Sequence, residues 1–290
     1  MKIQYLNGGL ANQVFQYIFY RYAQINCPEE QWFLDDSFFF VKKAHNGYEL
    51  EKVFGLMPNL LSRSLDSDVW QELIENKKKG ISIPQSFKNL GFPMIMIIEF
   101  GNYQEHNPFD GEVYQIPGNA FLPEIVDLKA EYVYYHGYWL HKGWFEACKD
   151  ILGKELVFPK LNDPMNLAYV DQILATDSVA VHVRRGDYVK IGWISQNEYY
   201  ENAISTILSE YPKAELFVFS DDIEWCRENE KTLGFCKAKN VTYVEGNVEG
   251  KNYIDLQLMS MCKFMVIGKS AFGYLAMLMN KQMRWCISDQ

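Results

Sequence analysis

Short apolar runs alternate with helical segments along the second half of the chain, and this alternation constrains the fold most strongly. Runs of buried-strand length are found at residues 179–183, 216–219, 241–244, 264–267 and, with fewer apolar residues, 284–287. Helical spacing is present at residues 198–209, 253–262 and 272–279, and a short helix is expected through Trp225. Short strands that alternate with helices are typical of a parallel sheet covered on both faces. This half is therefore predicted to be α/β.

The first half begins with the same pattern. A strand is expected at residues 3–6 and a helix at residues 13–25, joined by the glycine-rich residues 7–12. A turn of this kind can present backbone N–H groups to an anion. It matches neither a dinucleotide-binding nor a Walker A pattern, so a tight structural turn remains the alternative.

Domain organisation follows from length and from proline placement. Further strands are expected at residues 32–34, 95–100 and 132–139, and prolines bracket a polar connector at residues 158–164. A chain of 290 residues is long enough for two domains or for one large α/β unit. We expect two domains, 1–160 and 161–290.

Composition excludes several classes of function. The net charge of −9 argues against a nucleic-acid partner, since the only basic run is Lys77–Lys79. No run reaches the length of a membrane span, and the start of the chain lacks the pattern of a signal peptide. The six cysteines show no paired spacing, which indicates a reducing compartment rather than a disulfide or zinc framework. We expect a soluble cytoplasmic protein.

The most informative motif follows the strand at residues 179–183. It reads His182-Val183-Arg184-Arg185-Gly186-Asp187-Tyr188 and places two adjacent arginines at the end of a buried strand. Two guanidinium groups repel each other, and a phosphate that binds them in bidentate fashion relieves that repulsion. The alternative is a pair of surface arginines in a salt bridge with Asp187.

Two more polar segments follow predicted strands, at residues 220–222 and 268–272. In parallel α/β sheets, ligands bind beyond the carboxyl ends of the strands. We therefore expect these segments and residues 182–187 to converge on one crevice.

Five segments, in order along the chain, resemble motifs of the bacterial α-1,2-fucosyltransferases of glycosyltransferase family 11. Residues 8–17 are similar to GGLGNQMFQY, Gly137-Tyr138-Trp139 with Trp144-Phe145 to GYxQ…YF, and residues 182–188 to HxRRGDY. Residues 220–225 resemble SDDxxW, and residues 255–262 resemble DxxLMSxC. HxRRGD is shared with α-1,6- and protein O-fucosyltransferases. The first and last motifs narrow the resemblance to the α-1,2-fucosyltransferases.

The resemblance implies a GT-B-like fold, in which two Rossmann-like domains face a cleft. The domain at 1–160 would lie on the acceptor side, and the domain at 161–290 would bind the GDP-sugar. The implied reaction is inverting transfer of L-fucose from GDP-β-L-fucose to the 2-hydroxyl of a terminal β-galactoside, with no metal and no other cofactor. The expected partners are the nucleotide-sugar donor and a glycan acceptor of the lipopolysaccharide or capsule type. A lipid-linked acceptor would place the protein peripherally at the cytoplasmic face of the membrane.

The same resemblance implies roles for individual residues. Arg184 would replace a cation at the diphosphate, and Asp255 would accept the N1 and N2 hydrogens of guanine. Arg185 is expected to pair with Asp187, because strand side chains alternate. The general base stays open, with Asp187 a candidate by proximity and the phosphate itself an alternative. The remaining expected donor contacts are Gly8, Gly9, Asn12, His182, Asp221, Asp222, Ser270, Ala271 and Phe272, with Asn12 also a catalytic candidate.

Two of these residues have a structural alternative. His182 can be a hydrogen-bonded core residue, and Asp255 can be a charge on a helix surface. The chain also departs from the family after its last core strand, where NSTFSWW is usual and Gly268-Lys269-Ser270-Ala271-Phe272-Gly273-Tyr274 stands here. The competing functions are another fucosyl linkage, another GDP-sugar, or a non-catalytic protein that binds a glycan or nucleotide.

Overall fold

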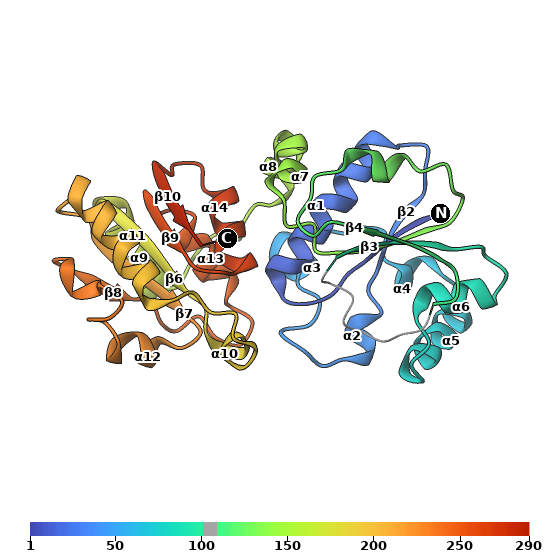
Figure 1. The fold of residues 1–290 in the computed structure, drawn as a ribbon, viewed down its shortest axis with the longest axis horizontal. Helices are drawn as coiled ribbons and strands as arrows, with labels where there is room; N and C mark the ends of the chain where they lie inside the picture. The colour runs from blue at the N-terminus through green and yellow to red at the C-terminus, as the bar shows by residue number, and fades with distance from the viewer. Residues whose placement is uncertain (101–108, 290) are drawn as a thin grey trace. The chain divides into compact units, whose positions relative to one another are not determined.

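The chain folds into two compact units. The computed structural model describes residues 1–100 and 109–289, and its units are Met1–Phe158 and Pro159–Gln290. Among the described residues each unit contains one five-stranded parallel sheet (Figure 1). The division lies beside the boundary expected between residues 160 and 161, while the roles expected for the two domains stay predictions.

The sheet of the first unit has the strand order β2-β1-β5-β3-β4. Its strands are β1 (Lys2–Tyr5), β2 (Trp32–Asp35), β3 (Ile95–Glu99), β4 (Glu112–Ile116) and β5 (Val133–His136). The helices described in this unit are α1 (Leu10–Asn26), α2 (Phe38–Val41), α3 (Leu50–Phe54), α4 (Leu61–Ser64), α5 (Ser67–Lys78), α6 (Ile83–Asn89), the 3-10 helix η1 (Pro123–Asp127), α7 (Lys142–Ala147) and α8 (Lys149–Glu155). β4 was not predicted from the sequence.

Aromatic side chains fill much of the first unit's core. Phe19 of α1 stacks on Trp139, with ring centroids 4.1 Å apart, and meets Trp144 edge-on at 5.2 Å. Both tryptophans are fully buried. Core packing therefore accounts for these aromatic residues.

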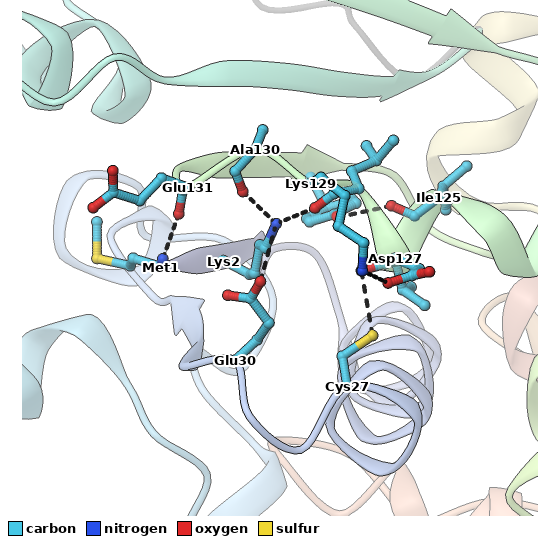
Figure 2. A network of polar contacts seen from close by, with 12 residues as sticks. Met1, Lys2, Cys27, Glu30, Ile125, Asp127, Lys129, Ala130 and Glu131 are labelled. Atoms are coloured by element: carbon cyan, nitrogen blue, oxygen red, sulfur yellow. Dashed lines mark hydrogen bonds and ion pairs between the residues drawn. The ribbon is translucent and has the colours of Figure 1, made fainter.

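The amino end of β1 is closed by a polar network (Figure 2). The fully buried Lys2 donates from Nζ to the carbonyl oxygens of Leu128, at 2.8 Å, and Ala130, at 2.6 Å, and lies 3.7 Å from Glu30. Burial is the main cause that lowers the pKa of this lysine. Because the network lies at the amino end of the strand, it stabilises the fold away from the edge where ligands bind such sheets.

The sheet of the second unit has the order β10-β9-β6-β7-β8. Its strands are β6 (Ser178–Val183), β7 (Glu215–Ser220), β8 (Val241–Tyr243), β9 (Phe264–Ile267) and β10 (Trp285–Ser288). The helices described here are α9 (Pro164–Ala175), α10 (Gly186–Ile191), α11 (Asn197–Glu210), α12 (Ile223–Glu228), the 3-10 helix η2 (Phe235–Lys237), α13 (Tyr253–Met259) and α14 (Ala271–Met279). The predicted parallel α/β class is confirmed in both units.

Successive residues of β6 show why this strand is buried on both faces. Val179, Val181 and Val183 pack in a core cluster with residues of α11 and η2. The alternate side chain His182 meets Phe272 of α14, with ring centroids 5.7 Å apart. Since helices cover both faces, the strand reads as a continuous apolar run.

Candidate functional site

The strand β6 ends at Val183, and the two arginines of the motif follow at the carboxyl edge of the sheet. Val183 pairs in register with Ser220 of β7. That register brings Asp221 and Asp222, which follow β7, to the same edge as Arg184 and Arg185. The convergence of residues 182–187 with residues 220–222 therefore follows from one parallel strand pair.

Arg184 lies between two carboxylates. Its NH2 donates to Asp187 at 2.5 Å, and its NH1 lies 2.9 Å from Asp221. The guanidinium carbon also lies 5.0 Å from the ring centre of Tyr188. Both ion pairs hold Arg184 beyond the end of β6, where the sequence predicts that a diphosphate binds.

Arg185 has different partners from those predicted. Its guanidinium carbon lies 3.4 Å from the ring centre of Trp225, and its Nε lies 3.3 Å from Oδ2 of Asp222. The expected Arg185–Asp187 pair is wrong, because Asp187 enters α10 three residues after Arg184 and pairs with that residue instead. Arg185 is thus a packing residue of this edge, anchored to the start of α12.

Gly186 allows the turn between the arginines and α10. Its φ of 23° lies in a region that favours glycine, and a Cβ here would stand 2.5 Å from a carboxylate oxygen of Asp221. The backbone N–H of Arg185 donates to the other oxygen of Asp221, at 2.9 Å. A side chain at residue 186 would therefore displace the carboxylate that holds Arg184.

Both arginines at this edge have carboxylate partners before any ligand binds. The carboxylates of Asp187, Asp221 and Asp222 already offset the repulsion between Arg184 and Arg185. The Asp187 side chain is 64% exposed, and exposed ion pairs contribute only about 0–1 kcal/mol. An arriving phosphate can therefore displace Asp187 from Arg184 at little cost.

His182 is buried beside the start of α14. Burial lowers its pKa to about 3, so the imidazole is neutral. Its Nδ1 is buried and makes no hydrogen bond within the part of the chain that the structure describes. The alternative that His182 is a hydrogen-bonded core residue is therefore not met at Nδ1 among the described residues. Contact between His182 and the nucleotide stays a prediction.

Ser270, Ala271 and Phe272 form the start of α14, as the sequence suggested. Ser270 caps the helix, and its Oγ accepts the backbone N–H of Phe272 at 3.2 Å. The backbone N–H of Phe272, a residue expected to contact the donor, is thus already engaged within the chain.

Close packing around residue 268 explains why glycine stands there in place of the first residue of the NSTFSWW motif. A Cβ at this residue would stand 2.1 Å from the hydroxyl of Tyr200 and 2.8 Å from that of Ser195. Tyr200 donates to the His182 carbonyl at 3.3 Å, and the Oγ of Ser195 accepts the Lys269 N–H at 2.9 Å. The sequence reading missed both hydroxyl residues, since no motif links them to residue 268.

Asp255 lies on α13. It is not the solvated surface charge that the sequence left open as an alternative to guanine binding. Burial raises its pKa to about 7. Its Oδ1 accepts a hydrogen bond from Asn247 at 2.8 Å. Asn247 was also missed, because it lies in a loop and carries no motif.

The N-terminal residues Gly8, Gly9 and Asn12 lie in the first unit. The helix α1 begins at Leu10, so Asn12 is helical and our expectation of a loop up to residue 12 is wrong. Gly8 has a φ of 75°, and its carbonyl accepts a hydrogen bond from Gln13 at 2.9 Å. These contacts define a tight turn, while its role toward donor or acceptor stays a prediction.

Within residues 1–100 and 109–289, no three His, Cys, Asp or Glu residues are grouped so that they could hold a metal ion. Across the same residues no helix has both the length and the apolar character to cross a membrane.

The fold of the chain resembles that of a known crystal structure. The crystal structure of POFUT1 in complex with GDP-fucose matches with a TM-score of 0.51 over 99% of this chain and 97% of that one, at 14% identity. With two parallel α/β units, the chain has the GT-B-like fold class expected from its motifs.

Sequence comparison then identifies the family. The model of glycosyl transferase family 11 matches residues 98–286, and the chain belongs to this family. An α-1,2-colitosyltransferase of Escherichia coli is 27% identical, over 93% of this chain and 84% of its own length. The O-antigen biosynthesis glycosyltransferase WbnK of Escherichia coli is 25% identical, over 95% of this chain and 89% of its own. A galactoside α-(1,2)-fucosyltransferase 2 of Mus musculus is 32% identical over 34% of this chain and 29% of its own.

Proposed function

We propose that the protein transfers L-fucose from GDP-β-L-fucose to the 2-hydroxyl of a terminal β-galactoside. Family membership supports glycosyl transfer, and the names of the relatives support a 1,2-linkage on a surface glycan such as O-antigen. The single observation that carries the proposal is the HVRRGDY segment, held at the carboxyl edge of the second sheet with Arg184 between two carboxylates.

The proposed chemistry is a single displacement at the anomeric carbon. The acceptor O2 attacks C1 of fucose from the face opposite GDP, its proton passes to a base, and the C1–O bond to the β-phosphate breaks. Negative charge grows on the leaving diphosphate, and Arg184 would stabilise that charge. Asp255 would accept the guanine N1 and N2 hydrogens, and the start of α14 would face the phosphates.

We predict transfer without a divalent metal. Purified protein with GDP-fucose and lactose in excess EDTA should release GDP and form a product that NMR shows to be α-1,2-linked. Loss of turnover in EDTA with recovery on Mn²⁺ would contradict metal independence. If GDP binds but no acceptor of a broad panel is fucosylated, a non-catalytic binding protein becomes the better interpretation.

A second donor remains open because a relative is named a colitosyltransferase. The same assay with other GDP-sugars compares their kcat/KM with that of GDP-fucose. A higher value for another donor would transfer the proposal to that sugar without changing the roles given to Arg184 and Asp255.

Asp187 is the proposed general base. Its carboxylate is exposed and pairs only with Arg184 among the described residues, so displacement by the arriving phosphate would free it to take the acceptor proton. Loss of a base typically lowers rates by about 10²–10⁴, so Asp187→Asn should lower kcat by roughly that factor and leave GDP affinity nearly unchanged. Steady-state kinetics and calorimetry with GDP measure the two effects.

Glu224→Gln is the matched control, since Glu224 is an exposed acid on α12 that faces Arg227 at 3.7 Å. It should leave kcat unchanged. If Asp187→Asn changes kcat only a few-fold, Asp187 is a counterion of Arg184, and the phosphate becomes the better candidate for the base.

A further inference from the structure

A chain of buried amides leads from the start of α9 to Asp255. Asp163 caps this helix and accepts from the backbone N–H of Asn166 at 2.9 Å and from its Nδ2 at 3.0 Å. Asn166 and Asn247 join their side-chain amides by two reciprocal hydrogen bonds, of 2.9 and 3.0 Å. Asn247 then donates to Oδ1 of Asp255 at 2.8 Å. The two asparagines are 2% and 6% exposed.

The direction of these hydrogen bonds is fixed from one end. Hydrogen bonds from Asn166 lower the pKa of Asp163, so its carboxylate is ionised and can only accept. The Nδ2 of Asn166 must therefore face Asp163, and its second hydrogen points to Oδ1 of Asn247. This leaves the Nδ2 of Asn247 to donate one hydrogen back to Asn166 and the other to Asp255.

The far side of Asp255 is left available. No hydrogen bond joins its Oδ2 to any residue of 1–100 or 109–289. Oδ1 keeps a second lone pair, because Asn247 uses only one. A guanine base offers two adjacent donors, N1–H and N2–H, which need two acceptor positions on one carboxylate.

We propose that Asn247 is a positioning residue that holds Asp255 as the double acceptor required by a guanine base. The inference rests on the proposed function, which makes GDP the leaving group. Beyond that function, it assigns Asn247 as the second residue of the site that recognises the base, and it assigns the amide chain that orients Asn247.

The electrostatic surroundings of Asp255 support this role. Burial raises its pKa to about 7, and the Asn247 hydrogen bond acts in the opposite direction. No ion pair with Asp255 is present among the described residues. The titratable or charged groups on the elements around it are Asp163, Tyr169 and Asp171 at or on α9, Tyr253 on α13, Tyr274 on α14, and Glu249 and Lys251 in the preceding loop.

The test measures GDP affinity by calorimetry between pH 5.5 and 9, with inosine diphosphate, which lacks the N2 amino group, as the comparison. In the unaltered protein GDP affinity should rise through about pH 7 as Asp255 ionises. Asn247→Leu removes a donor to a charged group, so the rise should move to higher pH and affinity at pH 7 should fall by about tenfold or more. The preference for GDP over inosine diphosphate should shrink as well.

A double variant guards against misfolding. Asn166→Leu with Asn247→Leu replaces both amides by apolar groups, which leaves no unpaired buried amide. It should melt like the unaltered protein and still show the shifted profile. Asn240→Leu, whose amide lies on the surface against Glu215, should leave the profile unchanged.

Different results would contradict the role of Asn247 and the proposed function. If the unaltered protein binds GDP and the folded variants keep its pH profile and base preference, Asn247 has no positioning role and the proposed function stands. If the unaltered protein prefers no guanine nucleotide at any pH, the proposed function fails, and the role of Asn247 fails with it.

Discussion

Replacing Arg184 with alanine is expected to lower kcat for fucosyl transfer by roughly 10²–10³, the usual effect of removing a preorganised donor from developing negative charge. Arg184 is held by Asp187 and Asp221 at the end of β6, so its guanidinium is fixed before the donor binds. Lysine should recover little, because an ammonium group is a point charge and lacks the planar fork with which arginine binds Asp221 and a phosphate together. Initial rates at saturating GDP-fucose measure the effect.

Arg185→Ala provides the matched control. This arginine stacks on Trp225 and pairs with Asp222, so its loss should lower the free energy of unfolding by about 1 kcal/mol and change kcat less. Urea unfolding and the same assay separate the two effects. If Arg185→Ala abolishes turnover while Arg184→Ala retains it, the roles assigned to the two arginines are wrong.

Gly268→Ala is expected to lower the free energy of unfolding of the second unit by about 1–3 kcal/mol, the typical cost of overpacking. The added Cβ would stand 2.1 Å from the hydroxyl of Tyr200, a side chain that is buried and hydrogen-bonded to the His182 carbonyl. Relief requires Tyr200 to move, which would disturb the end of β6 and with it the arginines. Urea unfolding followed by tryptophan fluorescence measures the change.

Two further variants decide whether the Tyr200 hydroxyl is the cause. Gly153 of α8 has no atom within 4 Å of an added Cβ, so Gly153→Ala should stabilise the protein by about 0.5–1 kcal/mol. Combining Tyr200→Phe with Gly268→Ala removes the oxygen that the Cβ would meet. The double variant should therefore be less destabilised than the sum of the single changes, and strict additivity would contradict this contact.

The sequence predicted those elements whose signal is local. The apolar runs of β6, β7 and β9 are buried on both faces and stand out without any partner. The strand β4 was missed because four of its five residues are exposed, which leaves no apolar pattern. The helix α9 was not predicted, and the connector was expected to end at its first residue, although Asp163 before Pro164 is a helix-start signal.

The candidate site could be predicted in its residue types but not in its pairings. The motif identified Arg184, and the strand ends identified Asp221 and Asp222. Which arginine meets which carboxylate depends on the β6–β7 register, which no local pattern encodes. The Asn166–Asn247 pair joins residues 81 positions apart, so the sequence alone gave no reason to connect them.

The division after Phe158 has a consequence for how such proteins diversify. Each sheet draws all its described strands from one side of the division, so neither needs a strand from the other half to complete it. Under the proposed function, most of the residues assigned to the nucleotide lie after this division. Under that function, recombination at the joint would exchange the unit expected on the acceptor side and keep the nucleotide residues of the second unit together.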